Sequence, residues 1–203
     1  MDIQAALINV SLLWLLTAPH EFAHAWTALR LGDDTPLREG RVTLNPLAHV
    51  DWMGTAILPA LTSLLGFGFL GWGKPVTTDP NKIRGGWNGV AIVALAGPAS
   101  NVVFAVILAL VAVAFRRMSP AAFHYLERGV YLSLYLALFN LIPMPPLDGS
   151  KLLLAAHIPF IIYRELAQFG FILLLLLLSY TDLGGLMASW SIQGGELIFR
   201  LFL

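Results

Sequence analysis

The amino-acid sequence predicts an all-α polytopic membrane protein with about five to six membrane segments, a short membrane-associated β element and one re-entrant or broken segment. Of its 203 residues, 58% are hydrophobic and only 12% are charged, and the mean hydropathy is +0.76. A soluble globule of this composition would have too little polar surface to cover itself. The apolar residues also gather into long runs between short polar loops. We therefore expect a single integral-membrane domain over residues 1–203.

The first half of the chain predicts one long helix, two short strands and an interrupted apolar segment. Residues 3–31 form an almost unbroken apolar run that ends at Gly32 and two aspartates, which are good helix-stop and turn residues. Residues 38–44 predict a short strand, because Val42 and Leu44 alternate with Arg41 and Thr43, and residues 71–76 form a second extended piece, so these two predict the β element. Residues 53–70 are apolar but contain three glycines and a proline, which favours a re-entrant hairpin or a broken helix.

The second half predicts further membrane segments joined by short loops. Residues 90–115 form a clear span, and residues 129–142 form an apolar run that three prolines interrupt soon after its end. A new helix is expected around residues 151–157, then a span over residues 159–180. The last apolar run, residues 183–203, is expected to be a membrane or interfacial segment.

A metal-binding motif, His20-Glu21-Phe22-Ala23-His24, lies inside the first apolar run. On a helix His20 and His24 are one turn apart, with Cβ atoms about 5–6 Å apart, so both imidazoles can reach one metal ion. Glu21 is rotated by about 100° and can act as a general base without being a ligand. This is the H-E-x-x-H arrangement of zinc metalloproteases. Such a pentad also arises by chance on unrelated helices, but ionisable groups in hydrocarbon are costly unless they pair or coordinate something.

A catalytic zinc site needs a third protein ligand and an open fourth position. The chain has no cysteine, so that ligand must be His, Asp or Glu, and the candidates are His49, Asp51 and Asp148. Asp148 is favoured because a proline-stiffened segment delivers it at the end of an apolar run. The alternative is that Asp148 merely caps the helix that follows, a position for which Asp is well suited. His49 could instead contact substrate or occupy the open zinc position transiently.

Three motifs together resemble the site-2 protease family of intramembrane zinc metalloproteases. They are the pentad at residues 20–24, Ala-Gly-Pro-Ala-Ser-Asn at residues 96–101, and Asn-Leu-Ile-Pro-Met-Pro-Pro-Leu-Asp-Gly at residues 140–149. The resemblance implies that Asp148 is the third zinc ligand and that Asn101 and Asn140 hydrogen-bond the bound peptide or the developing oxyanion. No stretch is long and polar enough for a PDZ domain, so the resemblance is to the small form of the family that lacks one.

This resemblance implies an enzyme that hydrolyses peptide bonds in or near the transmembrane segments of membrane-protein substrates, with Zn²⁺ as cofactor and the lipid bilayer as its setting. The net charge of +0 gives no support for a nucleic-acid partner. Two alternatives stay open. One is a different membrane zincin that takes a glutamate as third ligand, and the other is a catalytically inactive zinc-binding membrane scaffold. The oligomeric state is not predicted.

The distribution of basic residues predicts a multi-pass protein of the cytoplasmic membrane with its active site nearer the cytosolic face. The cytosolic basic residues would be Arg30, Arg38, Arg41, Lys74, Lys82, Arg84, Lys151 and Arg164, against Arg116, Arg117 and Arg128 outside. On that face, residues 38–44 with residues 74–76 beside them are a candidate strand edge for an unwound substrate. Alternatively, these pieces only seal the mouth of the cavity.

Overall fold

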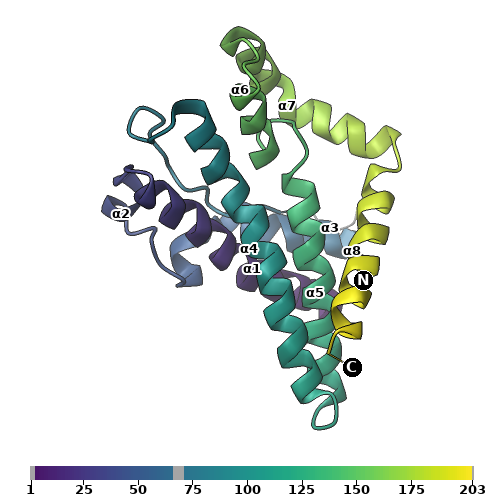
Figure 1. The fold of residues 1–203 in the computed structure, drawn as a ribbon. Helices are drawn as coiled ribbons and strands as arrows, with labels where there is room; N and C mark the ends of the chain where they lie inside the picture. Colours follow the sequence, from purple (N-terminus) through teal and green to yellow (C-terminus); the bar gives the residue numbers. More distant parts are fainter. Residues whose placement is uncertain (1–2, 66–70, 203) are drawn as a thin grey trace.

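The computed structural model describes residues 3–65 and 71–202, and within them every regular element is a helix or a helical turn (Figure 1). The elements are α1 (Ile3–Arg30), α2 (Thr35–Arg38), the 3₁₀ turn η1 (Pro46–His49), the π-helical turn η2 (Trp52–Ile57), α3 (Leu58–Leu65), α4 (Gly86–Phe115), α5 (Pro120–Asn140), the 3₁₀ turn η3 (Asp148–Ser150), α6 (Lys151–Ala155), α7 (Phe160–Tyr180) and α8 (Leu183–Arg200).

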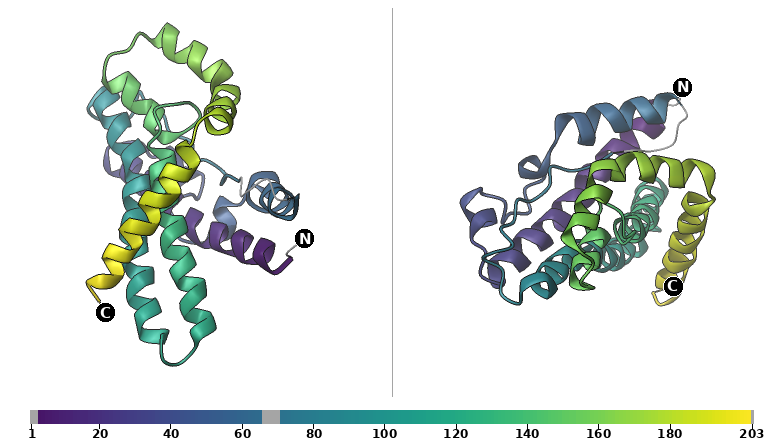
Figure 2. Two further views of the ribbon diagram at one scale, coloured as in Figure 1. Left: turned by 90° about the vertical axis from the view of Figure 1, so that its right-hand side faces the viewer. Right: turned by 90° about the horizontal axis from the view of Figure 1, so that it is seen from above.

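The centre of the molecule is the antiparallel pair α4 and α5, which α1 crosses on one side and α8 covers on another (Figures 1 and 2). Small side chains let these helices approach closely, which increases the van der Waals contact between them. The buried cluster at this junction consists of Leu16, Ala105, Leu108, Ala109, Ala112, Val130 and Phe199. The crossing of α1 over α4 is therefore fixed by close packing, and it determines where the pentad lies.

The predicted β element is wrong, because the described residues contain no strand. Residues 71–76 are extended, but their N–H groups do not meet a neighbouring strand. Instead Trp72 N–H donates to Gly54 O at 2.9 Å, and Lys74 N–H donates to His49 O at 2.9 Å. The first predicted strand begins at the end of α2 and continues through a turn at Gly40, whose φ is +67°. The alternation at residues 41–44 does not follow burial either, because the polar Arg41 is buried and Leu44 is 60% exposed.

The expected number of membrane segments is also wrong. Among the described residues, two helices are long and apolar enough to cross a membrane, α4 and α7. The helices α1 and α5 are long but carry polar groups, namely the pentad in α1 and the charged first half of α5. The predicted interrupted segment at residues 53–70 is helical from Trp52 to Leu65, and residues 66–70 lie outside the described residues.

Candidate metal centre

The pentad faces α4 at the point where a glycine leaves room for two imidazoles. A methyl group on Gly97 would overlap His24 Nε2 and come within 2.7 Å of His20 Cε1. Residue 97 is therefore the place where α1 and α4 cross with the histidine side chains between them. Any side chain at this position would push the imidazoles out of place.

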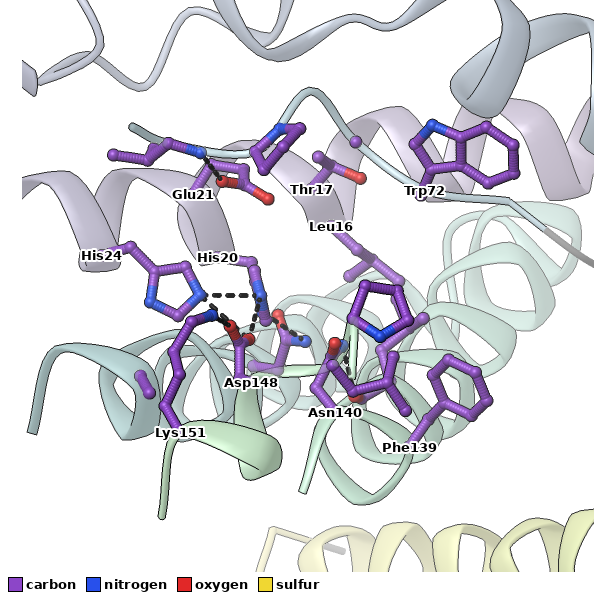
Figure 3. A pocket seen from close by; sticks show the side chains of 18 of the residues that line it. Leu16, Thr17, His20, Glu21, His24, Trp72, Phe139, Asn140, Asp148 and Lys151 are labelled. Atoms are coloured by element: carbon purple, nitrogen blue, oxygen red, sulfur yellow. Dashed lines mark hydrogen bonds and ion pairs between the residues drawn. The ribbon is translucent and has the colours of Figure 1, made fainter. Parts of the chain in front are cut away.

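His20, His24 and Asp148 present three ligand atoms to one point (Figure 3). The two Nε2 atoms are 3.0 Å apart, and Asp148 Oδ2 lies 3.1 Å from His20 Nε2 and 3.0 Å from His24 Nε2. Tetrahedral zinc with bonds of 2.0–2.1 Å would separate its ligand atoms by roughly 3.3 Å, so the three atoms need to move apart only slightly. Two imidazole nitrogens and one carboxylate oxygen are also a donor set that suits zinc.

The second ring nitrogen of each histidine has a buried partner. His24 Nδ1–H donates to Val93 O at 2.7 Å, which leaves Nε2 free to bind a metal. His20 Nδ1 lies 3.2 Å from the side-chain amide of Asn101, a residue that is 1% exposed. Since a neutral imidazole that binds metal through Nε2 carries its proton on Nδ1, Asn101 must turn its Oδ1 toward His20 in the loaded site.

The proline-rich loop after α5 delivers Asp148. Its carboxylate faces the two histidines and makes no capping hydrogen bond to the following turn, so the helix-cap alternative finds no support in the geometry. Gly149 lets the loop fold back onto α5, because a methyl group there would overlap Leu141 O. Gly170 of α7 presses equally closely on the carbonyl of Pro145. The aspartate is therefore held between two helices by backbone packing.

Glu21 lies next to the three ligand residues but outside their group. Its side chain is buried, and Oε2 accepts the N–H of Val76 at 3.0 Å (Figure 3). Oε1 has no hydrogen-bond partner among the described residues and is free to accept a proton. A carboxylate beside, but not within, a His-His-Asp group is the arrangement expected of a general base.

Comparison with known proteins finds relatives over most of the chain. "Putative zinc metalloprotease YwhC" of Bacillus subtilis is 34% identical over 195 residues, which cover 90% of this chain and 85% of that protein. The chain belongs to this zinc metalloprotease family. "Putative zinc metalloprotease Rip2" of Mycolicibacterium smegmatis is 37% identical over 174 residues, covering 81% of this chain and 64% of the relative. Rip2 of Mycobacterium tuberculosis is 32% identical over 190 residues, covering 85% and 67%. No family model and no solved structure matches the chain.

A cavity of about 610 Å³ adjoins the metal-binding group of this metalloprotease. Its polar lining includes His20, Glu21, His24, Asn101, Asn140, Asp148 and Lys151, and its apolar lining includes Leu13, Leu16, Val93, Phe139, Phe171 and Leu174. The cavity is large enough for several amino-acid side chains, and most of its wall is apolar. It can therefore hold an apolar peptide segment with its backbone beside the ligand group.

The remaining sequence-predicted residues take different places in the metalloprotease. Asn140 lines the cavity, where its Nδ2 donates to Leu136 O at 2.9 Å. His49 is 1% exposed, its Nε2–H donates to Thr43 O at 2.8 Å, and burial lowers the pKa of its imidazole. Asp51 caps η2 by accepting the N–H groups of Met53 and Gly54. The structure does not bring His49 or Asp51 into the ligand group.

Sequence reasoning missed two functional neighbours of the site. Lys151 Nζ donates to Asp148 Oδ1 at 3.0 Å, and its spacing of three residues from Asp148 was a helical signal that could have revealed the pair. Arg41 is buried, and its guanidinium donates to the carbonyls of Ala48, Lys74 and Pro75. It thereby anchors the chain next to Val76. Backbone partners of this kind leave no pattern in a sequence.

Proposed function

We propose that this zinc metalloprotease is an intramembrane endopeptidase of the site-2 protease type, which cleaves membrane-protein substrates in or near their transmembrane segments. The observation that carries the proposal is the convergence of His20, His24 and Asp148 beside Glu21 in a mostly apolar cavity. The apolar helix α4 forms one wall of this cavity, and a second apolar helix, α7, contributes Phe171 and Leu174. A metal group between such helices suits a substrate that is itself apolar.

Zinc in this site would polarise the scissile carbonyl and lower the pKa of water from about 15.7 towards 7. Glu21 then takes the proton from the attacking water through its free Oε1 and later passes it to the leaving amine. Its Oε2 stays bound to the Val76 N–H, which fixes the carboxylate in one orientation. The Asn140 amide lies on the cavity wall, where it can donate to the bound peptide.

A transmembrane substrate must lose helical structure before its peptide bond can be attacked, because a helix buries its own carbonyl and N–H groups. Each peptide group released in an apolar setting then needs a new partner. The polar side chains that line the cavity beside the ligand group can supply such partners, and the apolar residues of its lining can contact the substrate side chains. The site thus suits a short unwound stretch of an otherwise apolar segment.

We further propose that the beginning of α4 faces the cytosol. Several basic residues gather around that end: Arg84 donates to the carbonyls of Arg30 and Leu31, and Lys82 pairs with Asp34 at 3.1 Å. The opposite end of α4 carries the basic pair at residues 116–117. An excess of basic residues marks the cytosolic side of membrane proteins.

The alternative with a glutamate as third ligand finds no support in the described residues, where Glu127, Glu165 and Glu196 do not line the cavity. The alternative of an inactive zinc-binding scaffold would need the ligands but not Glu21. The burial of Glu21 against the cavity, with one oxygen fixed and the other free, favours an active hydrolase.

The test is cleavage of a panel of single-span membrane proteins by the purified chain in detergent or proteoliposomes. The native chain should cleave at least one of them, chelation should stop cleavage, and added zinc should restore it. Glu21→Gln should reduce cleavage by at least about a thousandfold while zinc stays bound, since it removes the general base but no ligand. Cleavage that survives in Glu21→Gln would contradict the proposal.

A further inference from the structure

The two oxygens of the Asp148 carboxylate have different partners. Oδ2 faces both histidines, at 3.0 and 3.1 Å, whereas Oδ1 accepts a hydrogen bond from Lys151 Nζ at 3.0 Å. In Figure 3 the lysine side chain reaches this carboxylate from α6, while the two imidazoles reach it from α1. The metal-facing oxygen and the lysine-facing oxygen are therefore distinct in the folded chain.

This ion pair differs from an ordinary surface salt bridge. The Asp148 side chain is 12% exposed and that of Lys151 is 35% exposed, so the ammonium group reaches inward from the rim of the cavity. Exposed ion pairs contribute little because water screens them, but a pair with one buried member is screened much less. Lys151 is also the one Lys or Arg among the described residues that line the cavity.

The position of the lysine follows from the local fold. Asp148 begins η3 and Lys151 begins α6 directly after it, so a spacing of three residues places both side chains on one face of a continuous helical turn. The proline loop and the close contacts of Gly149 and Gly170 hold that turn against α5 and α7. The ammonium is thus directed at Oδ1 by the same backbone that delivers the carboxylate.

We propose that Lys151 is a positioning residue that restricts Asp148 to binding the metal through one oxygen. A carboxylate can bind a metal through one or both oxygens, and a charge-assisted hydrogen bond to Oδ1 keeps that atom away from the ion. The coordination position that Oδ1 would otherwise take stays open for water or the substrate carbonyl, as a catalytic site requires. This inference rests on the proposed metal site and adds a residue that controls its coordination number.

The experiment compares the native chain with Lys151→Met and Lys151→Arg, each loaded with cobalt(II) in place of zinc. Four-coordinate cobalt(II) absorbs visible light more strongly than five-coordinate cobalt(II), so the spectrum reports the binding mode without reference to catalysis. Lys151→Met should lower the visible absorption by about twofold or more, because Oδ1 becomes a fifth ligand. Its kcat/KM with a cleaved substrate should fall by about 10–100-fold with one zinc still bound. Lys151→Arg, which keeps a charged donor, should retain the native spectrum.

A Lys151→Met protein with the native spectrum and native cleavage would overturn the inference. Lys151→Ala provides a second variant, and it should give the same spectral change as Lys151→Met, since the lysine lies at the rim and its removal leaves no closed cavity. The outcome also separates the two proposals. The native chain and Lys151→Met could differ in their cobalt spectra while the native chain cleaves no membrane protein of the panel. That result would contradict the proposed function and support the role of Lys151.

Discussion

His20 and His24 are held by different groups, although they are one helical turn apart. A backbone carbonyl, that of Val93, fixes the tautomer of His24, and no substitution of a side chain can remove it. His20 depends on the side-chain amide of Asn101, and Ser133 Oγ–H donates to the backbone carbonyl of the same residue at 2.7 Å. Asn101 thus contacts a ligand residue, whereas the family resemblance implies a contact to peptide or oxyanion.

These two roles of Asn101 make different predictions. If Asn101 orients His20, Asn101→Ala should weaken zinc binding by about 10–100-fold, because loss of the partner frees the imidazole to rotate and change tautomer. Competition with a chelator measures this directly. If Asn101 serves only the oxyanion, the same variant should bind zinc as the native chain does and lose kcat alone.

At the scale of elements, the crossing of α1 and α4 determines whether the site exists. The crossing occurs at Gly97, where the nearest atoms belong to the imidazole ends of the two histidines. A larger residue here would therefore displace the ligands before it disturbed the helix backbones. A substitution of Gly97 can therefore impair the site while the fold stays intact.

Gly97→Ala should consequently keep the helical structure and lower zinc affinity by at least about tenfold, since the added methyl group occupies the position of His24 Nε2. Circular dichroism and zinc titration measure the two properties separately. Gly194→Ala in α8 is the matched control, because its methyl group would meet Leu134 at an ordinary 3.4 Å. Equal zinc affinity in Gly97→Ala and the control would show that the crossing of α1 and α4 has room for a methyl group at residue 97.

A second connection between elements depends on pH. Asp33, three residues after the end of α1, accepts the N–H of Thr35 at 3.0 Å and that of Asp79 at 2.7 Å, and so ties the end of α1 to the segment that carries Val76. Burial alone would raise the pKa of Asp33, but these hydrogen bonds and Lys82 hold it below its usual value. Its stabilising contribution is therefore present above the unfolded pKa of about 3.9 and is lost as the pH falls through the lower folded value.

Asp33→Asn should accordingly unfold at a lower temperature than the native chain at about pH 6, and the difference should shrink as the pH falls below the unfolded pKa of about 3.9 toward the lower folded pKa. Thermal unfolding followed by tryptophan fluorescence at several pH values checks this. A difference between the two proteins that stays constant with pH would mean that the carboxylate charge of Asp33 does not contribute.

The sequence predicts local features of this site better than distant ones. The spacing of four residues on a helix places His20 and His24 on the same face, so this pair could be predicted from the sequence alone. Asp148 lies more than a hundred residues away, and only the resemblance raised it above the helix-cap alternative. The strand prediction failed because a short alternation of polar and apolar residues does not specify a backbone partner, and the buried Arg41 donates to loop carbonyls. The predicted number of membrane segments was wrong because polar side chains interrupt the apolar pattern, namely the pentad in α1 and the charged residues in the first half of α5.

For the whole molecule, the proposed orientation places the beginning of α4 in the cytosol and the loop between α4 and α5 outside. The chain contains no cysteine, so single cysteines can be introduced without background. Asn81 and Met118 are both exposed and lie near opposite ends of α4. In intact cells a membrane-impermeant maleimide should label Met118→Cys and should label Asn81→Cys only after permeabilisation. Labelling of Asn81→Cys alone in intact cells would reverse the orientation.

The most direct measurement of the metal centre is zinc content and affinity in the native chain, Asp148→Asn and Glu21→Gln, determined side by side on purified protein. We expect about one zinc per chain in the native protein and in Glu21→Gln, because Glu21 is not a ligand. Asp148→Asn should bind zinc at least about a hundredfold more weakly, since it loses the charged third ligand. Native zinc affinity in Asp148→Asn would show that Asp148 does not hold the metal and would contradict a metal centre made of His20, His24 and Asp148.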